Sequence, residues 1–211
     1  MIVAIDAASS DLSLALASLD GTLIGAEAWT SPQRQSAELL PRLVELLARN
    51  ERDMRGIAAL AVGSGPGSFT GLRVSMALAK GLAHALRRPL YGFPSLAAWL
   101  DAEPDAVAAV ARAGARDAFL LPRDAPAPVV VEREELATRL HGVRTVAPAE
   151  LVEAFGLEDA ARPRGAIAMA PAAAARLAAG DPGDDLATLE PIYLRAPRGV
   201  AVEAEGRVTW L

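Results

Sequence analysis

The chain has 211 residues, of which 52% are hydrophobic and 22% charged, with a formal net charge of −5 and a pI near 5.1. This length can bury a proper core, as one large domain or as two smaller lobes. The absence of cysteine excludes disulfides and thiolate chemistry, and no apolar run is long enough to cross a bilayer. Because the N-terminal sequence lacks the basic flank of a secretion signal, we expect a cytoplasmic protein.

The acidic balance also argues against this chain binding tRNA or DNA by itself. Affinity for a phosphate backbone comes chiefly from clustered Lys and Arg. Arg87-Arg88 is the only basic doublet in the helical part, and we interpret it as a C-terminal cap that complements the helix dipole. Aromatic residues, at 4%, are too few for a base-stacking platform.

The first half of the chain predicts three antiparallel strands followed by a helix, a strand and a helix. An apolar strand over residues 2–6 ends in Asp6, and residues 12–17 and 22–29 form a hairpin around Asp20-Gly21. A helix is expected over residues 35–49, because leucines recur on one face at helical spacing.

Residues 58–71 form the most distinctive stretch: a strand over residues 58–62, a glycine-rich loop, and a helix that begins near the predicted N-cap Thr70 and runs to about residue 86. The loop and helix start are a candidate anion site. Its residues are Gly65, Gly67, Ser68, Thr70 and Gly71. Their spacing matches neither a P-loop nor a dinucleotide fingerprint. Two interpretations therefore stay open: phosphate binding, or glycines that let the helix start pack tightly on the sheet.

The second half repeats this order of elements more weakly. We expect strands there over residues 90–92, 106–111, 117–121, 129–131, 143–146 and 166–169. We expect one short helix that starts at a Ser95 cap, and further helices over residues 133–141, 148–155 and 172–179, of which the second is closed by Gly156. Two copies of a βββαβα unit are the signature of the two-lobed actin-like ATPase and sugar-kinase (ASKHA) architecture, with ribonuclease H-like lobes. We predict an α/β fold with lobes over residues 1–101 and 102–211, the second reduced and ending in a tail.

One acid stands where nucleotide-handling members of this architecture hold their metal. Asp6 ends the first strand, although an aspartate hydrogen-bonded to the turn at Ser9 and Ser10 is the simpler interpretation. The equivalent position of the second lobe reads Arg112-Ala113-Gly114, and an arginine cannot coordinate magnesium. Efficient phosphoryl transfer is therefore not expected.

Hydrolytic chemistry has no better support. His84, within a helix, and His141, at a helix end, form no metal-ligand pair. Ser68 is the best nucleophile candidate, but no GxSxG signature accompanies it. We predict neither a catalytic residue nor a metal site.

The remaining candidate functional feature is an interaction surface. The helix over residues 35–49 and the helix that follows Thr70 are rich in leucine and small residues around much of their circumference. Two such neighbouring helices could form a four-helix interface with a matching pair of a partner, since alanines permit close approach.

Several segments resemble the bacterial TsaB (YeaZ) family. They are residues 4–8 and 13–16, the run Leu39-Leu40-Pro41, the string from Gly63 through Gly65-Pro66-Gly67-Ser68-Phe69-Thr70-Gly71-Leu72-Arg73, and residues 190–195. The resemblance covers the first lobe and the C-terminal strand, whereas the second lobe is similar only in its order of elements.

The resemblance implies a non-catalytic partner of TsaD, which with TsaE and a TsaC-type synthase makes N6-threonylcarbamoyladenosine beside the anticodon of tRNA. TsaD carries the metal-binding histidines and transfers the group. TsaB docks on TsaD through its first-lobe helices, forms a homodimer through the same surface when alone, and meets tRNA only through the complex. The expected partner-binding residues are Leu39, Leu40, Leu43, Leu47, Leu72, Val74, Met76, Leu78 and Leu82.

No cofactor is expected to be required by this chain, although ATP with magnesium could bind at the partner interface. The sequence departs from the family at Gln35, where a histidine is common, and at Arg112, where a DAR-type turn is common. Two alternatives stay open: an independent nucleotide-binding ATPase that uses Asp6 and the glycine loop, and a glycoprotease-like peptidase, an old label of the wider family.

Overall fold

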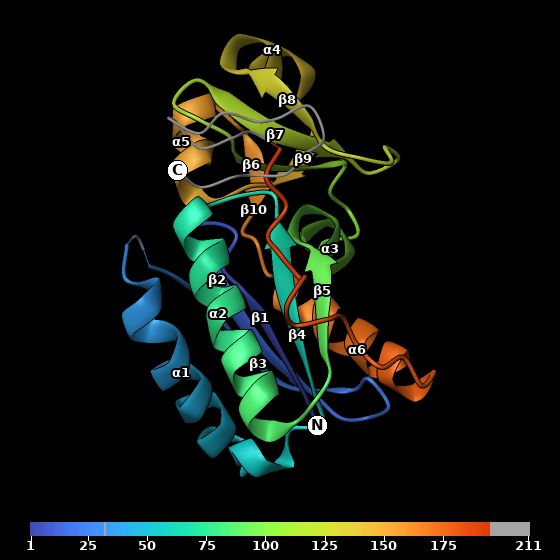
Figure 1. The fold of residues 1–211 in the computed structure, drawn as a ribbon. Helices are drawn as coiled ribbons and strands as arrows, with labels where there is room; N and C mark the ends of the chain where they lie inside the picture. Colours follow the sequence, from blue (N-terminus) through green and yellow to red (C-terminus); the bar gives the residue numbers. More distant parts are fainter. Residues whose placement is uncertain (32, 195–211) are drawn as a thin grey trace, which may run out of the picture.

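Two five-stranded sheets, built in the same order, form the structure (Figure 1). The computed structural model describes residues 1–31 and 33–194, so the predicted C-terminal tail lies outside the described residues. The first sheet has the strand order β3-β2-β1-β4-β5 and the second β10-β9-β6-β7-β8. In each sheet three consecutive antiparallel strands are followed by two parallel ones. The predicted duplication of a ribonuclease H-like unit is confirmed.

The first lobe is built around β1, whose residues alternate between two covered faces. Its elements are β1 Ile2–Asp6, β2 Asp11–Ala17, β3 Leu23–Thr30, α1 Gln35–Arg49, η1 Met54–Gly56, β4 Ala59–Gly65, α2 Phe69–Leu86, β5 Leu90–Pro94 and α3 Ser95–Ala102. Val3 and Ile5 pack with leucines of α1, and Ile2 and Ala4 face the opposite side. The helix predicted over residues 35–49 is confirmed, and the helix predicted to follow a Thr70 cap and run to about residue 86 is present but begins at Phe69.

The second lobe repeats the arrangement with shorter elements. They are β6 Ala108–Arg112, β7 Asp117–Pro122, β8 Val129–Glu132, α4 Arg133–Arg139, β9 Arg144–Val146, α5 Ala149–Phe155, β10 Asp159–Ala161 and α6 Gly165–Ala178. As predicted, α5 ends at Gly156, which takes the left-handed conformation with φ 65°.

The predicted strand over residues 166–169 is wrong, because these residues form the first turn of α6. The alternation of Ala and larger residues there resembles a strand, but Ala166, Met169 and Ala170 are buried at helical spacing. The last strand of the second sheet is instead β10, which the sequence analysis missed. Its three residues are exposed or half-buried and give no apolar signal.

Helix α6 follows the second sheet in the chain but packs on the first, where it covers the face of β1, β2 and β4 opposite to α1 and α2 (Figure 1). The alanines of both partners allow the backbones to approach closely. The predicted division at residue 101 thus assigns to the second lobe a helix that completes the core of the first.

After α6 the chain runs along the edge of the first sheet. Asp184 receives a backbone hydrogen bond from Gly92 N (2.6 Å), and Ile192 N donates to Ser64 O (2.7 Å). Arg176 pairs with Asp184 at 2.9 Å and lies 4.4 Å from the ring centre of Tyr91. The Asp184 contact covers the edge strand β5, which would otherwise expose unpaired backbone groups, whereas the Ile192 contact reaches the end of β4.

Candidate functional site

The glycine-rich segment begins inside the sheet. Strand β4 continues to Gly65, three residues beyond the predicted end, because β5 pairs with it as far as Pro94. The N-cap of α2 is Ser68, whose hydroxyl accepts from Gly71 N at 3.2 Å. The predicted cap, Thr70, is instead an exposed residue of the first helical turn.

Two of the glycines are required by close backbone contact. A Cβ on Gly67 would overlap the carbonyl oxygen of Ala8, and a Cβ on Gly71 would overlap that of Ala7. The start of α2 therefore lies directly against the turn that follows β1, where Ser68 N also donates to Ala8 O at 2.6 Å. Of the two interpretations left open by the sequence, this geometry favours tight packing of the helix start on the sheet.

Asp6 is 1% exposed, and its carboxylate is hydrogen-bonded within the protein. Trp99 Nε1 donates to Oδ2 at 2.5 Å, and the Ser95 hydroxyl donates to Oδ1 at 3.0 Å. Ser9 and Ser10, the predicted partners, hydrogen-bond elsewhere, to the backbone of Asp11 and to Glu150. Ser95, predicted as a helix cap, serves instead as a donor to Asp6.

Glycines also form the walls around this carboxylate. A Cβ on Gly63 would overlap Asp6 Oδ1, and one on Gly165 would lie 2.8 Å from Oδ2. The carboxylate of β1 thus bonds to side chains of α3 and lies directly against β4 and α6. Within residues 1–31 and 33–194, no group of three or more His, Asp or Glu side chains is arranged to hold a metal.

Burial raises the pKa of Asp6 above its ordinary value of 3.8, although the hydrogen bonds from Trp99 and Ser95 act in the opposite direction. The folded chain therefore holds this proton to higher pH than the unfolded chain, and the stabilisation is lost as pH rises through the raised pKa. We expect the stability of the wild type relative to Asp6→Asn to decrease as pH rises from below 3.8 to neutral. Urea unfolding of both chains across that range measures it, and a constant difference would contradict it.

A cleft of about 750 Å³ separates the two lobes beside the start of α2. Gly67, Ser68 and Thr70 of the predicted anion site line it, whereas Asp6, Gly65 and Gly71 do not. The second lobe contributes Arg112, Glu150 and Glu153, so that one positive and two negative side chains face the cleft. Without a cation, this balance disfavours a polyphosphate.

The lobes are tied together at this cleft by Asp11. The carboxylate, 5% exposed, accepts from Ala149 N at the start of α5 (2.9 Å) and from the Arg162 guanidinium (2.9 Å). Thr30 of the first lobe donates to the same group at 2.5 Å. This buried carboxylate thus helps to fix the position of the second lobe against the first, together with the hydrogen bond between Ser10 and Glu150.

The segments that carry the family resemblance meet in space. Tyr193 stacks against Phe69 with ring centres 5.3 Å apart, and Arg73 Nε donates to the Tyr193 hydroxyl at 3.0 Å. The Arg73 guanidinium lies 3.8 Å from the centre of the Phe69 ring. The C-terminal segment therefore packs on the start of α2, although 120 residues separate Arg73 from Tyr193.

The structure corrects the predicted partner-binding set. Five of its members are at most 3% exposed: Leu39, Leu43, Leu47 and Met76 belong to the core beneath α1 and α2, and Leu72 to the cluster with Trp99 of α3. Leu40 is 43% exposed, and Val44, which was not predicted, is 49% exposed. Val74, Leu78 and Leu82 are half-buried at the edge of the core. Val44 could have been found, because it lies one helical turn after Leu40.

We define an outer helix face by the five side chains that are exposed or half-buried on α1 and α2: Leu40, Val44, Val74, Leu78 and Leu82. The exposed residues Ala37, Ala48, Ala77, Gly81 and Ala85 lie on the same two helices. The helices lie side by side on one face of the first sheet (Figure 1). An exposed apolar surface of this kind, made of large and small residues together, is typical of a protein interface.

Neither histidine lines the cleft or donates to the Asp6 carboxylate. His84 is exposed near the end of α2, and His141 is exposed 3.5 Å from Glu158, beyond the end of α4.

None of the helices in the described part of the chain combines the length and apolar character needed to span a membrane.

The fold and the cleft place this chain in the class of two-lobed actin-like proteins with ribonuclease H-like lobes. The family model described as TsaD, tRNA N6-adenosine threonylcarbamoyltransferase, matches residues 30–121. An uncharacterized protein of Mycobacterium tuberculosis is 31% identical over 210 residues, covering 93% of this chain and 92% of the relative. The chain belongs to the TsaB (YeaZ) family.

Two further relatives carry descriptive names. The tRNA threonylcarbamoyladenosine biosynthesis protein TsaB of Escherichia coli is 38% identical over 95 residues, which is 45% of this chain and 40% of that protein. The structure of YeaZ from Pseudomonas aeruginosa aligns with a TM-score of 0.67 at 23% identity, over 92% of this chain and 99% of that one. At this identity the second likeness shows the fold alone.

Proposed function

We propose that this chain is a non-catalytic subunit that binds TsaD, together with TsaE, in the formation of N6-threonylcarbamoyladenosine beside the anticodon of tRNA. The observation that carries the proposal is the outer helix face, which is apolar, with Leu40 and Val44 of α1 exposed and Val74, Leu78 and Leu82 of α2 half-buried. The burial of Asp6 supports the non-catalytic part, since the acid that would hold a metal is engaged in internal hydrogen bonds.

The outer helix face suits a helical partner. Leu40 and Val44 project from one helix, and the small residues Ala77, Gly81 and Ala85 of the other permit close approach of a second pair of helices. Because such a face can also pair with itself about a two-fold axis, a homodimer of this chain would use the same surface. Homodimer and heterodimer then compete.

The other parts of the proposal rest on the family resemblance and on the acidic composition of the chain. tRNA is met through the complex rather than by this acidic chain alone. The subunit acts in the cytoplasm and requires no cofactor of its own. ATP with magnesium, where it binds, does so at the interface with TsaD.

Light scattering on a size-exclusion column tests the proposal. The chain is run alone, with its cognate TsaD, and with TsaD and TsaE, each with and without magnesium-ATP. We expect a homodimer for the chain alone and a new heteromeric species that forms at its expense when TsaD is added. Independent elution of the two proteins under all of these conditions would refute the proposal.

A further inference from the structure

Positive charge gathers at one end of the first lobe, where α2 ends. Four exposed arginines lie there: Arg52 and Arg55 around η1, and Arg87 and Arg88 after α2. We call these four residues the basic end. The acids Glu51 and Asp53 of the same region offset only half of that charge.

Backbone contacts hold the two segments together. Ala58 N donates to Met1 O at 2.8 Å, and Leu60 N donates to Pro89 O at 3.0 Å, so the chain after η1 and the chain after α2 meet at the same end of the sheet. The pKa of the Met1 amino group is lowered, first by burial and then by the charges of Arg52 and Arg88. The charges of both arginines thus act on the same group.

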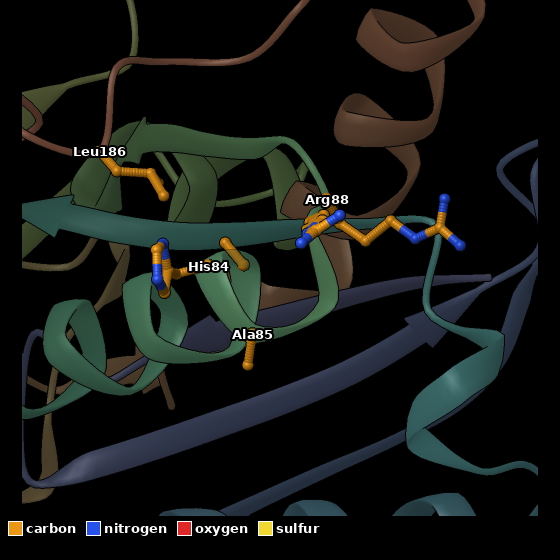
Figure 2. Close-up of a pocket in the computed structure, with 6 residues that line it drawn as sticks. His84, Ala85, Arg88 and Leu186 are labelled. Atoms are coloured by element: carbon orange, nitrogen blue, oxygen red, sulfur yellow. The ribbon is translucent and has the colours of Figure 1, made fainter.

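The end of α2 directs the two arginines outward. Arg87 takes the left-handed conformation, φ 53°, and so turns the chain out of the helix. A hollow of about 490 Å³ lies beside this turn. Figure 2 shows Arg88 at the helix end, away from His84 and Leu186, which also line the hollow.

Many of the protein's arginines form ion pairs with carboxylates, but in the part of the chain that the structure describes those of the basic end do not. Eight arginines each pair with a carboxylate: Arg34, Arg42, Arg49, Arg139, Arg144, Arg162, Arg164 and Arg176. Among the residues that the structure describes, Arg52, Arg55, Arg87 and Arg88 take part in no ion pair. Their charges remain available for an external anion.

We propose that the basic end contacts backbone phosphates of tRNA when this chain is bound to TsaD. The inference rests on the proposed function. Guanidinium groups match phosphate oxygens in a two-pronged geometry, and such contacts carry no sequence information. The basic end adjoins the outer helix face, because α1 and α2 both end near it (Figure 1). In a complex formed through the outer helix face, the basic end would therefore lie beside TsaD and could extend a tRNA-binding surface of TsaD.

The test measures tRNA affinity of the reconstituted complex over a series of salt concentrations. The variant is Arg87→Asn with Arg88→Gln, since asparagine tolerates the left-handed conformation. The matched control, Arg116→Gln with Arg133→Gln, removes two exposed arginines of the second lobe. We expect the slope of log affinity against log salt to fall by about 0.7–0.9 for each phosphate that is no longer neutralised, and the low-salt affinity to fall about tenfold or more. The control should match the wild type.

The possible outcomes separate this inference from the proposed function. Complex assembly is measured first by light scattering. Unchanged tRNA affinity and an unchanged salt slope in an assembled variant complex would overturn the inference. Weakened assembly with unchanged tRNA affinity would also overturn it, because that result would indicate that the basic end binds an acidic protein surface. If the wild-type chain does not bind TsaD, the proposed function fails. The isolated chain is then tested with tRNA at low salt, where binding that the variant loses supports the basic end and no binding overturns it.

Discussion

A chain carrying Leu40→Glu and Val44→Lys is expected to bind TsaD at least about 100-fold more weakly than the wild type, because an interface core tolerates buried charge poorly. Both side chains are almost half exposed, so the fold should not depend on them. The new residues stand four apart with the acid first, an arrangement that supports the helix and leaves the net charge unchanged. Titration calorimetry or surface plasmon resonance with immobilised TsaD measures the loss.

The matched control is Val107→Glu with Val129→Lys. These valines are 47% and 48% exposed on the second lobe, so the same chemical change is made at the same exposure away from the outer helix face. We expect wild-type affinity from this control and wild-type circular dichroism from both variants. Equal affinity of the two double variants would show that the outer helix face is not the docking surface.

Gly71→Ala is expected to destabilise the protein by about 3 kcal/mol or more, which corresponds to a loss of roughly 6–12 °C in melting temperature. The added methyl group would overlap the carbonyl oxygen of Ala7, so the start of α2 must move away from β1. Such a contact cannot be relieved by a change of rotamer, because the overlapping atom belongs to the backbone.

Gly81→Ala provides the control within the same helix. No atom lies within 4 Å of the added methyl group, and alanine is favoured over glycine in a helix interior by roughly 0.5–1 kcal/mol. Thermal unfolding should therefore show a lower melting temperature for the first variant and a slightly higher one for the second. A melting temperature of Gly71→Ala within a degree or two of the wild type would mean that the close approach to Ala7 is not a packing requirement.

Much of the first lobe could be predicted because its signals are local. The turn at Asp20-Gly21 identifies the hairpin, and the spacing of the leucines identifies α1 to the residue. The helical pattern does not show which leucines face the core. Leu40 and Leu43 both fit an apolar stripe, but only the position of the sheet decides that one is exposed and the other buried.

The features that were missed depend on contacts between distant parts of the chain. The partners of Asp6 follow it by 89 and 93 residues, so neighbouring serines were the only donors that the sequence could suggest. The glycine-rich string identifies the family, yet its spacing could not reveal that Gly67 and Gly71 serve contact with Ala7 and Ala8. Local composition also misled the prediction at Ala166, where a helix rich in small residues resembled a strand.

The packing of α6 on the first sheet has a consequence for how this protein is made. Strands β1 to β5 leave the ribosome well before residues 165–178, so the alanine-rich face of Ile2 and Ala4 stays uncovered while the second lobe is synthesised. The first lobe cannot reach its native core as an early cotranslational unit, although N-terminal domains commonly do so. This core is completed only after α6 has been synthesised, and until then the nascent chain leaves part of an apolar sheet face uncovered.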